Sequence, residues 1–308
     1  MSNKPKYKHL NTETNEIMEM SLQEKIKWAR NKHFIYYPKA RQCIERLGWI
    51  YEQTIYDSNE FPSDLEGLSI IGYSGAGKTS IYQEFLKQHS SKSYPSYEGI
   101  PVSYCLLKDS ITGLKGLYSA LLTPYGHPFA DPEAMKIQRI TIDQLEEVLI
   151  YTLKQSGTKL VFIDEFQHVR GRNQQAILNQ LKRTMLVSRV PFVPVGTPDA
   201  KKVLDLDPQL ADRCPIKTYS ILDYWSYSIE FRKFLKGYEE YLPFPEPSNL
   251  SAKDLSFMIF KKVQFQDGSD KGKTNLRHIA RFLMTMANAA LLQKLPNISE
   301  EIIDKITF

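Results

Sequence analysis

The chain has 308 residues, of which 42% are hydrophobic and 24% are charged, and this balance excludes an intrinsically disordered protein. No apolar run approaches the roughly 18 residues of a membrane-spanning helix, and the polar N-terminal segment lacks the apolar centre of a secretion signal. We therefore expect a cytoplasmic protein, whose net charge of +5 is compatible with a nucleic-acid partner but is not by itself evidence for one.

The N-terminal region begins with a stretch, residues 1–20, that is poor in apolar side chains, and we expect a loose arm there. A short helix is predicted over residues 22–30. After Pro38, apolar residues such as Cys43, Leu47 and Ile50 recur at three- and four-residue spacing, which predicts an amphipathic helix. The turn-rich segment 57–67 then connects this helix to the next part of the chain.

Five short apolar runs follow, and each is typical of a buried strand: residues 68–72, 100–107, 159–163, 191–195 and 215–221. Helical patterns separate them, notably over 131–156 and 174–186. This alternation predicts a parallel sheet covered on both faces. After residue 222 the pattern is helical throughout, so we expect an arm (1–32), an α/β domain (33–222) and an all-helical domain (223–308).

The stretch IGYSGAGKTS matches the phosphate-binding pattern G-x-x-x-x-G-K-[ST] at every fixed position, between a predicted strand and a predicted helix. Glycines let successive backbone N–H groups turn toward phosphate oxygens, and the helix start adds its positive end. Lys78 is expected to reach the phosphates and Thr79 to bind Mg²⁺. The predicted nucleotide loop consists of Gly72, Tyr73, Ser74, Gly75, Ala76, Gly77, Lys78, Thr79 and Ser80.

Two acidic residues, Asp164 and Glu165, directly follow the apolar run LVFI. Asp164 can complete the Mg²⁺ shell opposite Thr79, and Glu165 can accept a proton from an attacking water. The alternative is that Asp164 caps the next helix while Glu165 faces solvent. The phosphate loop upstream favours the catalytic interpretation, which predicts an ATPase.

Three further residues have possible roles at the phosphates. Thr197 follows the strand at 191–195 and can sense the γ-phosphate, or it can simply be a helix N-cap. Arg213 precedes the last strand and can reach a neighbouring subunit's nucleotide, or it can be an ordinary surface arginine. Arg277 opens a helix of the C-terminal region, from which it can fold over the phosphates, although its position alone is weak evidence.

Several segments occur in the order and spacing of an AAA+ ATPase: GYSGAGKT, LVFIDEFQH, ILNQLKRTM, PFVPVGTPDA and QLADRC. With YYPKA at residues 36–40, they resemble more narrowly the TniB/TnsC family of transposition regulators, which carries a Y-P-[KR]-A segment before its ATPase core and DE-x-H after the acidic strand. The resemblance covers residues 33–295. Cys214 stands in place of an aromatic residue, Pro194 interrupts an otherwise aliphatic strand, and beyond residue 240 only the helical character matches.

The resemblance implies a P-loop AAA+ fold: a three-layer α/β core with a five-stranded parallel sheet, followed by a small all-helical lid. It also implies a bacterial regulatory ATPase that uses ATP and Mg²⁺ and oligomerises on double-stranded DNA as a ring or filament, like a hexamer or heptamer. Its partners would be a transposase and a target-selector protein, which in CRISPR-associated transposons is an effector or adaptor. Hydrolysis would reset the assembly.

DNA contacts are expected in the loops that follow two of the strands, where such ATPases present Lys and Thr to the phosphate backbone. The candidates are Lys108, Thr112, Lys115, Arg170 and Arg172. Each cluster can equally be a solvated charged surface. A replication-type loader or initiator ATPase shares the core but should carry a winged-helix domain, and a small-molecule kinase is disfavoured by the IDE strand.

Overall fold

A computed structural model describes residues 6–54, 65–93, 98–109 and 113–306 of the chain. The chain divides into two compact units. One unit contains the larger part of the α/β region, Gln42–Tyr73 and Lys78–Leu222. The other contains Met1–Arg41, the short segment Ser74–Gly77 and Asp223–Phe308. None of the described helices is long and apolar enough to cross a membrane.

Within the described residues of the α/β unit, a five-stranded parallel sheet has the order β4-β5-β6-β1-β7. The five-stranded parallel sheet that we expected is therefore confirmed. The strands are β1 (Ile70–Gly72), β4 (Val102–Leu106), β5 (Leu160–Asp164), β6 (Phe192–Gly196) and β7 (Ile221–Leu222). A short antiparallel pair lies outside this sheet and consists of β2 (Lys92–Ser93) and β3 (Glu98–Gly99).

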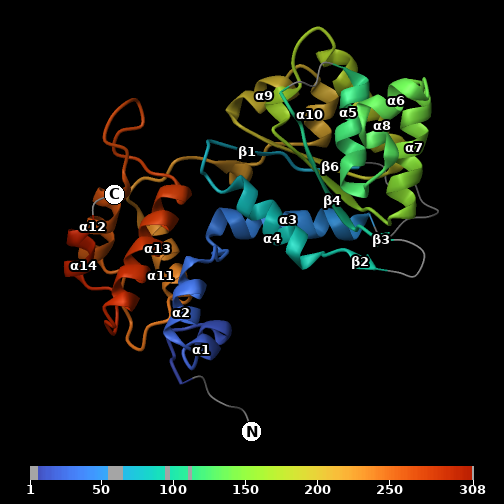
Figure 1. Ribbon diagram of the computed structural model, residues 1–308. Helices are drawn as coiled ribbons and strands as arrows, with labels where there is room; N and C mark the ends of the chain where they lie inside the picture. Colours follow the sequence, from blue (N-terminus) through green and yellow to red (C-terminus); the bar gives the residue numbers. More distant parts are fainter. Residues whose placement is uncertain (1–5, 55–64, 94–97, 110–112, 307–308) are drawn as a thin grey trace. The chain divides into compact units, whose positions relative to one another are not determined.

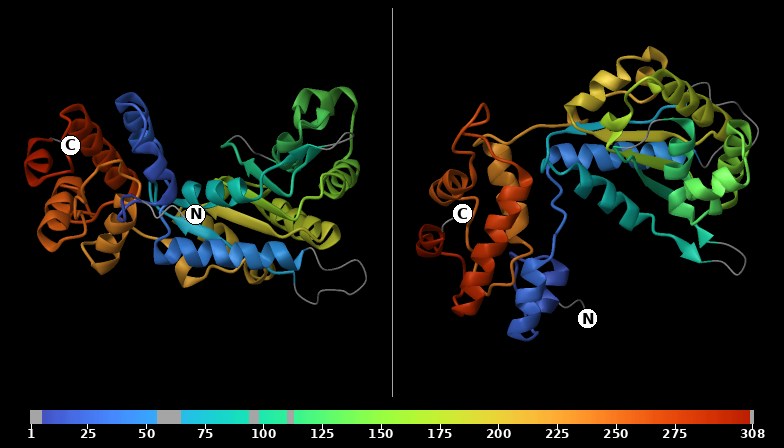
Figure 2. Two further views of the ribbon diagram at one scale, coloured as in Figure 1. Left: turned by 90° about the horizontal axis from the view of Figure 1, so that it is seen from below. Right: turned by 45° about the horizontal axis from the view of Figure 1, so that its top comes forward.

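Helices cover both faces of the sheet (Figures 1 and 2). The side chains of β5 alternate between the two faces, and the strand is therefore buried along its whole length. On one face, Phe162 contacts the ring of Phe85, and Phe85 in turn contacts Tyr51. On the other face, Val161 and Ile163 belong to the main hydrophobic cluster. The first face is covered by α3 (Pro38–Gln53) and α4 (Lys78–Gln88).

The main hydrophobic cluster includes residues of the helices that follow β4, β5 and β6 along the chain. These are α5 (Leu114–Leu122), α6 (Pro132–Ile137), α7 (Ile142–Gln155), α8 (Gln174–Ser188), α9 (Pro198–Leu204) and α10 (Pro208–Arg213). Single-turn 3-10 helices lie between these elements: η1 (Thr123–Tyr125) and η2 (Pro128–Ala130) join α5 to α6, η3 (Phe166–His168) follows β5, and η4 (Thr218–Ser220) precedes β7.

Two predicted elements are wrong in detail. The single helix expected over 131–156 is interrupted, because Arg139 adopts a left-handed backbone (φ 50°) and Thr141 starts α7 with a reciprocal capping box. The strand expected over 215–221 is reduced to Ile221–Leu222. The Ser220 hydroxyl accepts the N–H of Lys217 and stabilises the turn η4 instead.

The second unit is helical in its C-terminal part. Its helices there are α11 (Ile229–Glu239), α12 (Lys253–Val263), α13 (Leu276–Leu292) and α14 (Glu300–Lys305). Their apolar faces meet in a core that includes a ring contact between Phe231 of α11 and Phe260 of α12. This agrees with the all-helical character expected after residue 222.

The N-terminal segment is folded where it is described, so the expectation of a loose arm over 1–20 is wrong for residues 6–20. It forms α1 (Thr12–Ile17) and α2 (Leu22–Arg30), and α2 packs along α13. The Trp28 indole donates a hydrogen bond to the Tyr241 carbonyl oxygen (3.0 Å), and the Arg30 guanidinium donates one to Asn288 (3.0 Å). The segment folds with few apolar residues because polar side chains form hydrogen bonds with the backbone groups of its turns.

Asn15 provides the densest set of these polar contacts. Its amide nitrogen donates to the carbonyl oxygens of Tyr7, Leu10 and Asn11, and its amide oxygen accepts the Tyr7 N–H. We expect Asn15→Leu to leave these groups unpaired at a cost of about 1–3 kcal/mol. The arm should then open locally, and trypsin should cleave at Lys25 or Lys27 faster than in the wild type. Glu16→Ala, an exposed neighbour, is the control; equal cleavage of the two variants would contradict the prediction.

Candidate functional site

The phosphate-binding loop joins β1, which ends at Gly72, to α4, which begins at Lys78. Gly75 (φ 76°) and Gly77 (φ 102°) lie in the left-handed region, where a side chain would strain the backbone. The Lys78 ammonium donates hydrogen bonds to the carbonyl oxygens of Gly72 (2.7 Å) and Tyr73 (3.1 Å), so its charge lies at the loop itself. The local geometry is that of an anion-binding turn at a helix N-terminus.

The tip of this loop groups with the C-terminal helices, in the same compact unit. Asn275 caps α13 by accepting the His278 N–H, and the Arg277 N–H donates to the Gly75 carbonyl oxygen (3.2 Å). The structure thus places the backbone of Arg277 beside Gly75, within one unit, and the Arg277 side chain is exposed. A role for its guanidinium at the phosphates stays a prediction.

Asp164 ends β5 and is only 6% exposed. Burial raises the pKa of its carboxyl group, because the charged form loses hydration. Hydrogen bonds partly compensate: the Glu165 N–H bonds to Oδ1 (2.8 Å), the Tyr104 hydroxyl bonds to Oδ2 (3.3 Å), and the Tyr82 hydroxyl also interacts with this carboxylate. A cation placed beside this buried carboxylate would stabilise its charged form.

Two tyrosines that the sequence analysis did not single out connect the predicted metal ligands. The rings of Tyr82 (α4) and Tyr104 (β4) stack with centroids 4.8 Å apart, and burial raises the pKa of both phenols. The Tyr82 hydroxyl interacts with the side chains of both Thr79 and Asp164. The structure therefore brings Thr79 and Asp164 to the same phenol, although they are far apart in the sequence. The signal that was available is the position of Tyr82, one helical turn after Thr79.

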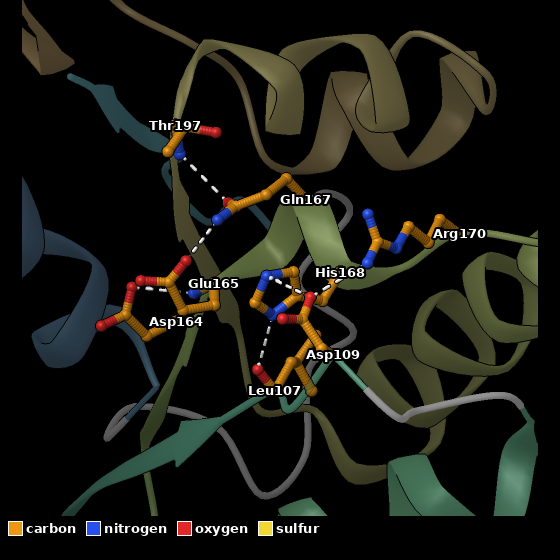
Figure 3. Close-up of polar contacts among 8 residues, drawn as sticks. All are labelled: Leu107, Asp109, Asp164, Glu165, Gln167, His168, Arg170 and Thr197. Atoms are coloured by element: carbon orange, nitrogen blue, oxygen red, sulfur yellow. Dashed lines mark hydrogen bonds and ion pairs between the residues drawn. The ribbon is translucent and has the colours of Figure 1, made fainter. Parts of the chain in front are cut away.

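Glu165 has an unusual backbone conformation for a residue with a side chain (φ 57°, ψ 40°). Its carboxylate accepts a hydrogen bond from the Gln167 amide, and the Gln167 amide oxygen accepts the Thr197 N–H (3.1 Å) (Figure 3). Thr197 is the N-cap residue of α9, but among the described residues its hydroxyl makes no capping bond. Thr197 thus has the position of a helix N-cap, as the alternative interpretation predicts, but its hydroxyl group does not form the hydrogen bond of a cap.

The loops after β4 and β5 are tied together by one aspartate (Figure 3). Asp109 accepts from the His168 ring (2.9 Å) and from the Arg170 guanidinium (3.1 Å), and the other ring nitrogen of His168 lies 2.9 Å from the Leu107 carbonyl oxygen. Two basic clusters about sixty residues apart are therefore neighbours. This adjacency was not foreseen from the sequence.

The candidate DNA-binding residues lie around this connection. Lys108, Lys115, Arg170 and Arg172 are all exposed, whereas Thr112 lies outside the described residues. A shallow hollow of about 450 Å³ lies between the two loops and is lined by Gly113, Leu114, Lys115, Gly116, Ile142, Asn173 and Ala176.

Arg213 is the last residue of α10, and its backbone carbonyl accepts the Gly67 N–H just before β1. Its side chain is half-buried. Position alone does not assign it to a neighbouring subunit's nucleotide, so this role remains a prediction.

The donor set fits Mg²⁺ bound together with nucleotide. Among the described residues, no group of three or more His, Cys, Asp and Glu side chains could hold a metal ion by itself. Mg²⁺ typically takes one or two protein oxygens and completes its shell with phosphate oxygens and water. The Thr79 hydroxyl and the buried Asp164 carboxylate supply that number of protein oxygens.

Comparison with known proteins identifies the family of the chain. The family described as Bacterial TniB protein matches residues 25–220, about two thirds of the chain. The chain belongs to the TniB family. Its phosphate loop, acidic strand and AAA+ fold make it an ATPase of the AAA+ class. No curated protein matches it in sequence.

Solved structures show the same fold at low sequence identity. The Aeropyrum pernix ORC2 protein, in ADPNP–ADP complexes, is similar with a TM-score of 0.58 and 17% identity over 91% of this chain and 70% of that chain. The Aeropyrum pernix ORC1 protein in complex with DNA gives 0.56 and 13% over 91% and 67%. These likenesses establish the architecture of this TniB-family chain.

The raised pKa of Asp164 leads to a stability prediction. Since the folded chain binds this proton more tightly than the unfolded chain, wild-type stability should fall as the pH rises from the ordinary aspartate pKa through the raised one. Asp164→Asn keeps the acceptor for the Glu165 N–H and removes the charge. At pH 7, without nucleotide and with a chelator, we expect it to raise the free energy of unfolding, because the buried charge is no longer present.

Denaturant titrations at pH 4 and pH 7 measure this difference. The advantage of Asp164→Asn should be small at pH 4 and larger at pH 7. Asp212→Asn, at an exposed position, is the control. An Asp164→Asn variant that is no more stable than wild type at pH 7 would show that the carboxylate is fully compensated in the folded chain.

Proposed function

We propose that this TniB-family ATPase binds ATP and Mg²⁺, oligomerises on double-stranded DNA, and links target selection to the recruitment of a transposase. Hydrolysis then resets the assembly. The observation that carries the proposal is the arrangement around β5. The strand that delivers Asp164 and Glu165 is followed directly by a basic loop, which Asp109 ties to the basic loop after β4.

We assign a role to each residue of the nucleotide site from its chemistry. Lys78 binds phosphate oxygens at the loop, and Thr79 and Asp164 hold Mg²⁺, which neutralises phosphate charge when bound. Glu165 takes a proton from the attacking water. The β5, β6 and β1 strands are neighbours in the sheet, so the residues at their ends face a common edge.

Thr197, Arg213 and Arg277 complete the proposed site. Thr197 directly follows β6, the neighbour of β5, and its hydroxyl contacts the γ-phosphate or the water. Arg277 acts from the start of α13, whose backbone already bonds to Gly75. Arg213 acts on the nucleotide of the next subunit, which makes oligomerisation a condition for fast hydrolysis.

The DNA-binding surface is formed by the loops after β4 and β5, with Lys108, Lys115, Arg170 and Arg172 contributing charge and Thr112 a hydroxyl. Lysine and arginine contacts of this kind bind the phosphate backbone without reading the base sequence. Support comes from the exposure of the four basic residues and from the direct link between the loops. The similar ORC1 protein was solved in complex with DNA, which is consistent with this use of the fold.

The role of Glu165 is tested by Glu165→Gln. Loss of the proton acceptor should slow ATP hydrolysis on the order of 10²–10⁴-fold and leave ATP-dependent assemblies on duplex DNA intact. Mass photometry after removal of free ATP measures their lifetime. Glu147→Gln, exposed on α7, is the control. Disassembly of the Glu165→Gln variant at the wild-type rate would refute the proposed base.

The DNA-binding surface is tested by the double variant Lys115→Ala/Arg172→Ala. Each lost phosphate contact should reduce the slope of log K against log salt concentration by about 0.9, so a reduction near 1.8 is expected for both. Fluorescence anisotropy with ATP and two unrelated duplex sequences measures this. Lys154→Ala, at an exposed position on α7, should behave as wild type. An unchanged slope would place the DNA elsewhere on the chain.

A further inference from the structure

Gln167 uses both ends of its side-chain amide to connect the ends of two neighbouring strands (Figure 3). The Thr197 backbone N–H can only donate, so the amide oxygen must face it. The Glu165 carboxylate can only accept when ionised, so the NH₂ group must face it. The orientation of the amide therefore follows from its partners.

The position of Gln167 is fixed by its surroundings. It lies in the single turn η3 between Phe166 and His168, and the Phe166 side chain is fully buried. Gly196 leaves the space that the amide occupies, because a Cβ atom there would lie 2.5 Å from the Gln167 oxygen. The amide oxygen also satisfies the N–H of the α9 N-cap residue, the bond that a capping box would otherwise supply from within the helix.

We propose that Gln167 is the positioning residue of the hydrolytic site: its amide holds the Glu165 carboxylate in place and links it to Thr197 at the end of β6. Glu165 needs such support, because its left-handed backbone is an unfavourable conformation for a residue with a Cβ atom. Through this link, a displacement of Thr197 by bound nucleotide reaches the carboxylate directly. The inference rests on the proposed function, in which Glu165 activates the water.

The two halves of the amide can be separated by substitution. Gln167→Glu keeps an oxygen for the Thr197 N–H but offers no donor to Glu165 and adds a like charge beside it. Gln167→Met removes both hydrogen bonds at similar volume. If the donor to Glu165 is what matters, both variants should lower kcat on the order of 10–100-fold with KM for ATP within about twofold of wild type. Gln155→Met, an exposed residue of α7, is the control.

The decisive measurement is a double-mutant cycle in single-turnover ATP hydrolysis with the full chain and duplex DNA. If Gln167 acts through Glu165, adding Gln167→Met to Glu165→Gln should cause no further loss, because the group it positions is already gone. Multiplicative losses would assign Gln167 an independent or merely structural role. Wild-type kcat in Gln167→Glu would also overturn the proposal, because the amide donor would then be dispensable.

The outcomes for the two proposals are distinguishable. Wild-type hydrolysis by Glu165→Gln would refute the base itself. Loss of hydrolysis in Glu165→Gln with wild-type kcat in both Gln167 variants would leave the base in place and refute only the positioning role. Two control measurements accompany these comparisons. The melting temperatures of the Gln167 variants test whether the fold is retained, and the binding of a fluorescent ATP analogue tests whether the nucleotide affinity is retained.

Discussion

The chemistry of this chain depends on one constraint, the meeting of parallel strand ends at a single edge of a buried sheet. Because β5, β6 and β1 are neighbours, the acidic pair, Thr197 and the phosphate loop follow adjacent strands. Burial that stabilises the sheet also deprives Asp164 of water, and this raises the pKa of its carboxyl group. Such a carboxylate, poorly hydrated in its ionised form, binds a cation more favourably than a hydrated one does.

The same edge accounts for the polar side chains that surround the carboxylates. Tyr82 and Tyr104 contact Asp164 from the α4 side, and Gln167 contacts Glu165 from the β6 side. His168, next to Gln167, bonds toward the loop after β4. One short turn, η3, therefore touches both the proposed water-activating group and the proposed DNA-binding loops.

Membership of the TniB family and the AAA+ architecture agree with what the motifs predicted, and they rest on different evidence. The family match covers residues 25–220, whereas the C-terminal helices are described by the structure alone. Pro194 lies inside β6, between two neighbouring strands, where proline is uncommon because it lacks an N–H group. The strand nevertheless keeps its parallel pairing on both sides.

The sequence by itself determined the order of strands and helices, the phosphate loop and the acidic pair, because these depend on local patterns: apolar runs, glycine positions and residue spacing. It predicted an uninterrupted helix over 131–156 and a loose N-terminal arm. The left-handed backbone at Arg139 and the hydrogen bonds of Asn15 are local, but composition and the spacing of apolar residues do not reveal them. Trp28, in contrast, bonds to a residue 213 positions away. Only the tertiary structure placed Tyr82, Tyr104 and Gln167 at the site and Asp109 between the two basic loops. Those contacts join residues up to about eighty positions apart, and they form only when strand ends meet at one edge of the sheet.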